Sequence, residues 1–206
     1  NKAARTTCVK PAGTTSLVLG TSSGIHAWHN DYYIRRLRVG KNEAIYKYLI
    51  NNNPELVKDE YFRPHDTAVI EIPQASPKGS ILRTESAFDL MERVKLVAND
   101  WVKPGHRTGS NTHNVSATIS LKKEEWDKAG EWMWKNRDCY NGLSVLPYDG
   151  GTYTQAPFED ITKKKFEELA KLLHDVNLEN VIEVTDETDL SGELACAGGS
   201  CEITSL

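Results

Sequence analysis

The most regular alternation of apolar and polar residues lies between positions 115 and 121. Apolar side chains occupy the odd positions from Val115 to Leu121, and serine or threonine occupies the even ones. A period of two predicts a half-buried strand. Shorter runs predict strands over residues 32–39, 67–72 and 143–146. In the first of these, Arg36 and Arg38 are expected on the face opposite Leu37 and Val39, and Pro73 is expected to end the second.

Helical spacing is clearest from Thr84 to the Lys103-Pro104-Gly105 segment, with Thr84 expected to cap the helix. Its apolar stripe consists of Phe88, Met91, Val94, Ala98 and Trp101. Further helices are expected over residues 16–20 and 42–49, around 126–133, and after an N-cap at Thr162. Strands that alternate with helices indicate an α/β fold with a largely parallel sheet.

Length and charge narrow the class of protein. The chain has 206 residues, 39% of them hydrophobic, and a formal net charge of -4, which is ordinary for a soluble protein of one large or two small domains. The charge argues against a general nucleic-acid binder, and no apolar run reaches transmembrane length. Four cysteines are too few for a disulfide scaffold, so a cytoplasmic location is expected. Because the chain begins with Asn1 rather than Met, we expect it to be the C-terminal part of a longer protein.

The first candidate site is the segment from Cys8 to Ser16. Pro11 and Gly13 favour a sharp turn, and Thr14 then begins a run of hydroxyl residues at a helix start. Free N–H groups at such a start can bind an anion. An ordinary helix cap with nothing bound explains the same residues, and the segment by itself leaves both interpretations open.

The second candidate site is the cysteine pair Cys196 and Cys201 near the C-terminus. Two glycines lie between the cysteines, in a stretch from Asp186 onward that has little to bury and is expected to be mobile. An accessible dithiol suits thiol–disulfide exchange. A zinc site and an incidental pair remain alternatives. Cys8 and Cys139 are expected to be small buried groups, and no metal role is assigned to any of the six histidines.

Four segments in a fixed order resemble the C-terminal part of the class II ribonucleotide reductases, the adenosylcobalamin-dependent kind, and the triphosphate-reducing branch most of all. These segments are Lys10–Thr14, Asn114–Ile119, Leu143–Tyr148 followed by Gly150-Gly151 and Gln155-Ala156-Pro157, and the terminal CAGGSC. The resemblance runs along nearly the whole chain. It implies that residues 1–185 are the C-terminal portion of a ten-stranded α/β barrel and that residues 186–206 are a flexible redox-active tail.

The resemblance also implies roles for particular residues. Ala12, Gly13, Thr14 and Thr15 would bind the phosphates of a ribonucleotide, and the two tail cysteines would form a dithiol that is recharged by thioredoxin or a similar reductant. The family carries serine where this chain has Ala12, which removes one hydroxyl from the turn. The radical cysteine, the cysteine pair oxidised by the reaction and most of the adenosylcobalamin site would lie outside this chain, so that it would be inactive alone. No partner nucleic acid or membrane is implied.

Two alternatives remain at this stage. The first is a fragment of a class I large subunit, whose paired tyrosines are missing from the 143–146 strand. The second is a non-catalytic phosphate-binding module with a redox or zinc-binding tail.

Overall fold

The computed structural model describes residues 2–148, 150, 153–183 and 185. The chain forms two compact units, and each is built from two separate segments. The first unit comprises Asn1–Trp28 and Gly79–Gly150, and the second comprises His29–Lys78 and Gly151–Leu206. Cys196 and Cys201 lie outside the described residues.

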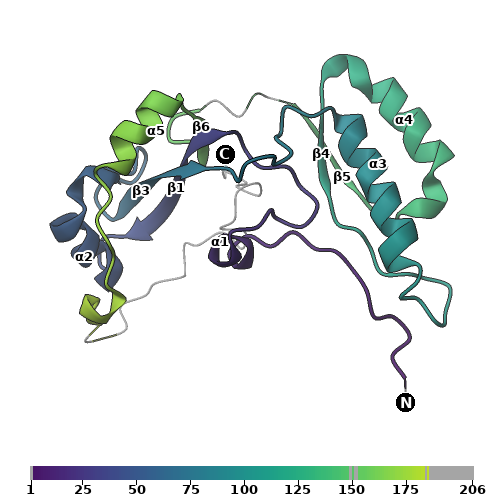
Figure 1. Ribbon diagram of the computed structural model, residues 1–206, viewed down its shortest axis with the longest axis horizontal. Coiled ribbons are helices and arrows are strands. Elements are labelled where there is room, and N and C mark those ends of the chain that lie inside the picture. The colour runs from purple at the N-terminus through teal and green to yellow at the C-terminus, as the bar shows by residue number, and fades with distance from the viewer. Residues whose placement is uncertain (1, 149, 151–152, 184, 186–206) are drawn as a thin grey trace. The chain divides into compact units, whose positions relative to one another are not determined.

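The first unit packs helices against a short parallel strand pair (Figure 1). Strands β4 (Thr118–Leu121) and β5 (Ser144–Pro147) pair in parallel, with Ile119 opposite Val145. Helices α3 (Ala87–Val97) and α4 (Trp126–Lys135) supply Met91 and Ala129 to a core that they share with Ile119. The alternation predicted from the sequence is confirmed, since Val115, Ala117, Ile119 and Leu121 are all buried.

Helix α3 differs from the prediction at both ends. Its N-cap is Ser86 rather than Thr84, because Ser86 and Asp89 form a reciprocal capping box. At the other end the helix continues as a π-helical turn over Ala98–Val102. The wider turn moves the apolar stripe by one residue. Val102 is therefore buried, while Trp101, which was expected in the stripe, is half exposed.

The second unit is an antiparallel sheet, and the expectation of a largely parallel sheet is wrong here. In the described residues, β1 (Tyr32–Gly40), β2 (Val57–Asp59), β3 (Thr67–Ala75) and β6 (Phe158–Asp160) lie in the order β2-β3-β1-β6. Every neighbouring pair is antiparallel. Alternation could not reveal the strand direction, because parallel and antiparallel strands share the period of two. The fold is mixed α/β.

The two faces of this sheet have the characters that the sequence predicted. Val39 on β1 packs with Ala68 and Ile70 of β3 against helix α2 (Ala44–Asn52), and Arg36 and Arg38 are on the other face. Helix α5 (Lys163–Ala170) begins at the predicted cap, where the Thr162 side chain accepts a hydrogen bond from the backbone N–H of Lys165.

Pro73 does not end β3, which continues to Ala75. The strand pairs with β1 along its whole length but with β2 only from Ala68 to Ile70. A proline is tolerated beyond Ile70 because no described strand pairs with that side of β3 there.

The remaining short elements are α1 (Thr15–Leu19) and 3₁₀ turns. The turns are at Pro54–Leu56, Lys123–Glu125, Arg137–Cys139 and Leu178–Asn180. Among the described residues, no helix is both long and apolar enough to cross a membrane.

Candidate functional site

The turn over residues 10–15 is held in place by the loop that follows α1. The backbone N–H of Ala12 donates to the Ser23 hydroxyl at 3.0 Å, and the Ser16 hydroxyl donates back to the carbonyl of Ala12. Gly24 lies in the left-handed region with a φ of 60°, and a Cβ there would lie 2.8 Å from the Lys10 carbonyl oxygen. The turn and the loop are therefore in backbone contact, and only glycine allows that contact without displacement.

Three consecutive backbone N–H groups lie at the end of the turn. Within the described part of the chain, the N–H groups of Gly13, Thr14 and Thr15 donate no hydrogen bond, and all three residues are exposed. Thr14 is the N-cap of α1, but its side chain makes no capping hydrogen bond. Ala12 differs from these three, since its N–H is already bonded to Ser23. Adjacent N–H groups of this kind can cradle an anion.

The segment before the turn is fixed beside the chain that leads into β4. Val9 forms a parallel bridge with Val115, and the N–H of Ser116 donates to the Val9 carbonyl at 2.9 Å. Alternation then points the neighbouring Cys8 outward. Cys8 is exposed and Cys139 is half-buried, so the expectation of two buried cysteines is wrong for Cys8.

His26 connects the loop behind the turn to the start of β4. Its Nε2 accepts a hydrogen bond from the Thr118 N–H at 3.0 Å, and its Nδ1 lies 2.8 Å from the Ser23 carbonyl oxygen. An accepting Nε2 places the ring proton on Nδ1, which donates to Ser23. His26 thus fixes the position of Ser23, and the Ser23 hydroxyl accepts the hydrogen bond from Ala12. Sequence reasoning missed both His26 and Ser23, because nothing in their spacing marks either as a partner of the turn.

Arg93 of α3 adds a second anchor for the same loop. Its guanidinium donates to the Ile25 carbonyl at 3.0 Å and forms an ion pair with Glu85. The hydrogen bonds that Arg93 donates to Glu85 raise the pKa of Arg93 above its usual value and outweigh the opposing effect of burial. The loop behind the turn is therefore tied to both β4 and α3.

The first unit also contains a cavity of about 270 Å³, bordered by Val102, Lys103, His113 and Cys139. This volume is below the roughly 300–1,000 Å³ of pockets that enclose drug-sized ligands. The described cavity therefore does not fit a group as large as a corrin cofactor. In the described ranges, no cluster of three or more His, Cys, Asp and Glu side chains is placed to hold a metal ion.

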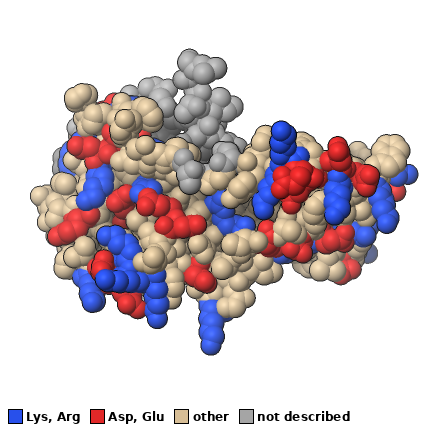
Figure 2. Space-filling model, turned by 90° about the horizontal axis from the view of Figure 1, so that it is seen from above, with Lys and Arg blue, Asp and Glu red and all other residues tan. Residues whose placement is uncertain are grey.

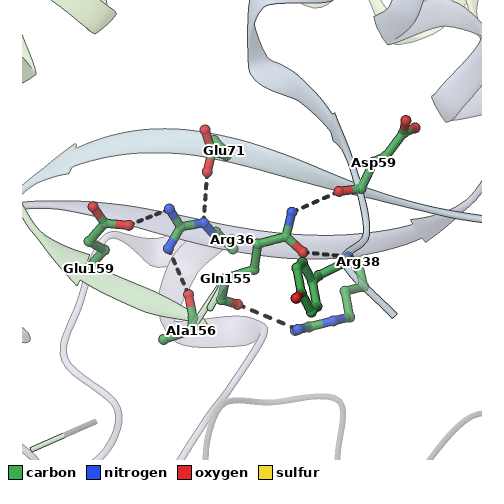
Figure 3. Close-up of polar contacts among 8 residues, drawn as sticks. Arg36, Arg38, Asp59, Glu71, Gln155, Ala156 and Glu159 are labelled. Carbon is green, nitrogen blue, oxygen red and sulfur yellow. Dashed lines mark hydrogen bonds and ion pairs between the residues drawn. The ribbon is translucent and has the colours of Figure 1, made fainter. Parts of the chain in front are cut away.

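The second unit contains a polar network around β1 (Figure 3). The Arg36 side chain is only 8% exposed; it forms ion pairs with Glu71 at 2.7 Å and with Glu159, and it donates to the Ala156 carbonyl at 3.0 Å. Burial lowers the pKa of Arg36, but the hydrogen bonds to the two carboxylates outweigh it and leave the pKa raised. The network joins β6 and the segment before it to β1 and β3.

Gln155 comes directly before Ala156 in the sequence. It has a positive φ of 55°, which is uncommon for a residue with a side chain. Its amide oxygen accepts from the Tyr61 N–H at 2.8 Å, and its amide nitrogen donates to the Asp59 carbonyl at 2.7 Å. Its own carbonyl accepts from Arg38. Figure 3 shows Gln155 between Arg38 and Asp59, so this residue fixes the loop between β2 and β3.

Comparison with known proteins gives consistent results. No protein-family model matches the chain. An adenosylcobalamin-dependent ribonucleoside-triphosphate reductase of Euglena gracilis is 30% identical over 95% of the chain, and one of Lactobacillus acidophilus is 28% identical over 98%. A crystal structure of a B12-dependent (class II) ribonucleotide reductase superposes on 84% of the chain with a TM-score of 0.66 and 24% identity, which supports the fold. The chain spans about a quarter of the length of these proteins.

Proposed function

We propose that this chain, a homologue of adenosylcobalamin-dependent ribonucleoside-triphosphate reductases over a quarter of their length, works as one part of such an enzyme. The complete enzyme would reduce ribonucleotides, as triphosphates, to 2′-deoxyribonucleotides by thiyl-radical chemistry. The observation that carries this proposal is similarity over nearly the whole chain to several such reductases.

The proposed contact with the substrate phosphates is the turn at Gly13, Thr14 and Thr15. Ala12 belongs to the same turn, but its N–H is already bonded to Ser23. Three exposed N–H groups without partners among the described residues support this assignment. A hydrogen bond from a backbone N–H to a phosphate oxygen is charge-assisted, and such a bond contributes about 1.5–3 kcal/mol. Because α1 has only five residues, the local N–H groups, rather than a helix dipole, would hold the phosphate.

Cys196 and Cys201 are the proposed electron relay. Their two thiols would reduce an active-site disulfide by exchange, which leaves a Cys196–Cys201 disulfide and two active-site thiols. A thioredoxin-like dithiol would then return two electrons and two protons to the tail. The spacing of the two cysteines and the glycines between them support this role.

Adenosylcobalamin, when bound, supplies the radical that starts the reaction. We place its site mainly in the part of the reductase that lies outside this chain, because that part makes up about three quarters of the similar proteins. We also propose that β4 and β5 form a portion of a ten-stranded barrel, and their parallel pairing supports this.

The surface charge bears on the other partners. Acidic and basic side chains are interspersed over the face shown in Figure 2, and the net charge is -4. This distribution favours a protein that binds neither nucleic acid nor a membrane surface. A cytoplasmic location is proposed on the small number of cysteines, four in 206 residues.

The test is deoxyribonucleotide formation by the full-length reductase that contains this chain, supplied with adenosylcobalamin, thioredoxin and either ribonucleoside tri- or diphosphates. We expect turnover with the triphosphates. Cys196→Ser and Cys201→Ser should each abolish multiple turnover with thioredoxin while leaving a single round of product, and Cys139→Ser should retain turnover. Unimpaired multiple turnover in the two tail variants would refute the relay. Absence of any reduction by the intact enzyme would refute the function.

A further inference from the structure

The loop over residues 60–66, between β2 and β3, presents two neighbouring aromatic rings to solvent. Tyr61 is 64% exposed and Phe62 is 76% exposed. Their rings contact each other edge to face, with centroids 5.0 Å apart and planes at 87°. Adjacent exposed rings of this size are typical of interfaces.

The backbone beneath these rings is braced by buried polar groups. Glu60 is only 5% exposed, and its carboxylate accepts from the N–H groups of Phe62 at 2.6 Å and Arg63 at 2.7 Å. The amide of Gln155 accepts from the Tyr61 N–H at 2.8 Å. The loop is therefore ordered without a partner, and a partner would bind it without a large cost for ordering it.

Lys41 braces the far end of the same loop. Its ammonium group donates to the Pro64 carbonyl at 2.6 Å and to the Asp59 carboxylate at 2.5 Å, and its backbone N–H donates to the Asp66 carbonyl at 2.7 Å. Both sides of the ring pair are thus fixed by side chains from elsewhere in the second unit.

The charges around the rings are balanced. Arg38, Lys41 and Arg63 each pair with a carboxylate of the loop or its edge, at 3.6, 2.5 and 2.8 Å respectively. A loop with balanced charge does not attract a polyanion such as nucleic acid or an acidic membrane. The perpendicular rings, already in contact, also leave no slot in which a nucleobase could stack between them. Two exposed aromatic rings surrounded by paired charges fit an apolar pocket on a protein.

We propose that the Tyr61–Phe62 ring pair docks into an apolar pocket of the reductase polypeptide that lies outside residues 1–206. This inference rests on the proposed function, since the two reductases compared above are about four times as long as this chain. Large permanent interfaces are rich in buried aromatic side chains. The ring pair is an anchor by which this part of the enzyme is held to the rest.

The test uses the full-length reductase with Phe62 replaced by the photo-cross-linking residue p-benzoylphenylalanine, a substitution of one large aromatic side chain by another. After irradiation, digestion and mass spectrometry, we expect a cross-link from position 62 to a peptide of the same polypeptide outside residues 1–206. The matched control carries the same photo-residue in place of Trp134, which is 73% exposed on α4. We expect no cross-link from position 134 to that peptide.

Three results would overturn the inference: no peptide cross-link from position 62, a cross-link only within residues 1–206, or a cross-link only to a second copy. Deoxyribonucleotide formation by the unmodified enzyme is measured in parallel. Activity without the cross-link refutes the docking and leaves the proposed function intact. A cross-link in an enzyme that reduces no ribonucleotide refutes the function and leaves the interface.

Discussion

Replacing Gly24 by alanine tests whether close backbone contact shapes the turn at residues 10–15. Gly24 has a φ of 60°, and an added Cβ would lie 2.8 Å from the Lys10 carbonyl oxygen and 3.5 Å from the Cα of Pro11. The left-handed conformation costs an alanine about 1–2 kcal/mol. Displacing a packed neighbour costs about 1–3 kcal/mol more. We therefore expect Gly24→Ala to lower the free energy of unfolding by about 2–5 kcal/mol.

Gly20 provides a matched control. It has the same φ of 60°, but nothing lies within 4 Å of its ideal Cβ position. Gly20→Ala should therefore lose only the conformational contribution of about 1–2 kcal/mol. The difference between the two variants isolates the contact with Lys10.

Two measurements read out this difference. Urea unfolding followed by circular dichroism gives the stability of each variant, and steady-state kinetics of the full-length reductase give KM for the ribonucleotide. If the displaced turn loses one charge-assisted hydrogen bond to phosphate, worth about 1.5–3 kcal/mol, KM should rise on the order of 10- to 100-fold in Gly24→Ala. KM should be unchanged in Gly20→Ala. Equal losses of stability and equal KM values in the two variants would refute the reasoning.

Three further predictions concern the anchors of both units. Ser23→Ala removes the acceptor of a backbone N–H in the turn and should raise KM about 5-fold, for a loss of about 1 kcal/mol; an unchanged KM would contradict the role of that hydroxyl. Arg36→Leu removes a buried guanidinium and leaves the partly buried Glu71 carboxylate without it, so it should lower the free energy of unfolding in urea by about 3 kcal/mol, whereas Arg63→Leu, in an exposed pair, should lower it by less than about 1 kcal/mol. The Ser86 hydroxyl lowers the pKa of Asp89 below its usual value, so the ionised carboxylate stabilises the folded protein. Asp89→Asn should therefore be less stable than the unmodified protein above about pH 4, and this difference should disappear as the pH falls through the lowered pKa. A stability difference that persists at pH 2 would argue against the capping carboxylate.

The sequence predicts the local elements well and the sheet poorly. Periodicity locates α3 and β4 because each buries one regular face. It also locates β1 and α5, although β1 buries the adjacent Tyr33 and Ile34 and α5 has only partly buried side chains. It does not reveal that β1 pairs with β3 in antiparallel register, with Tyr32 opposite Ala75, because that pairing depends on contacts distant in sequence. The three-residue strands β2 and β6 are too short to show a period.

The candidate site is predicted to a similar extent. The Pro-Ala-Gly-Thr-Thr run identifies the turn, because its chemistry is local. The residues that hold the turn, Ser23, His26 and Arg93, act through tertiary contacts, and no local spacing connects them to it. The tail cysteines, predicted from their spacing, lie outside the described residues, so their role stays a prediction.

The interleaved arrangement of the two units affects how the chain folds during its synthesis. Ala156, which accepts a hydrogen bond from Arg36, is translated 120 residues after it. At roughly 5–20 residues per second, a ribosome needs about 6–24 s to deliver Ala156 and the strand that follows it. Throughout that interval, the edge of β1 that pairs with β6 is open, and Arg36 lacks its ion pair with Glu159. Nascent chains are therefore open to strand pairing with one another, and the first unit cannot be completed until residues 79–150 have followed the inserted segment.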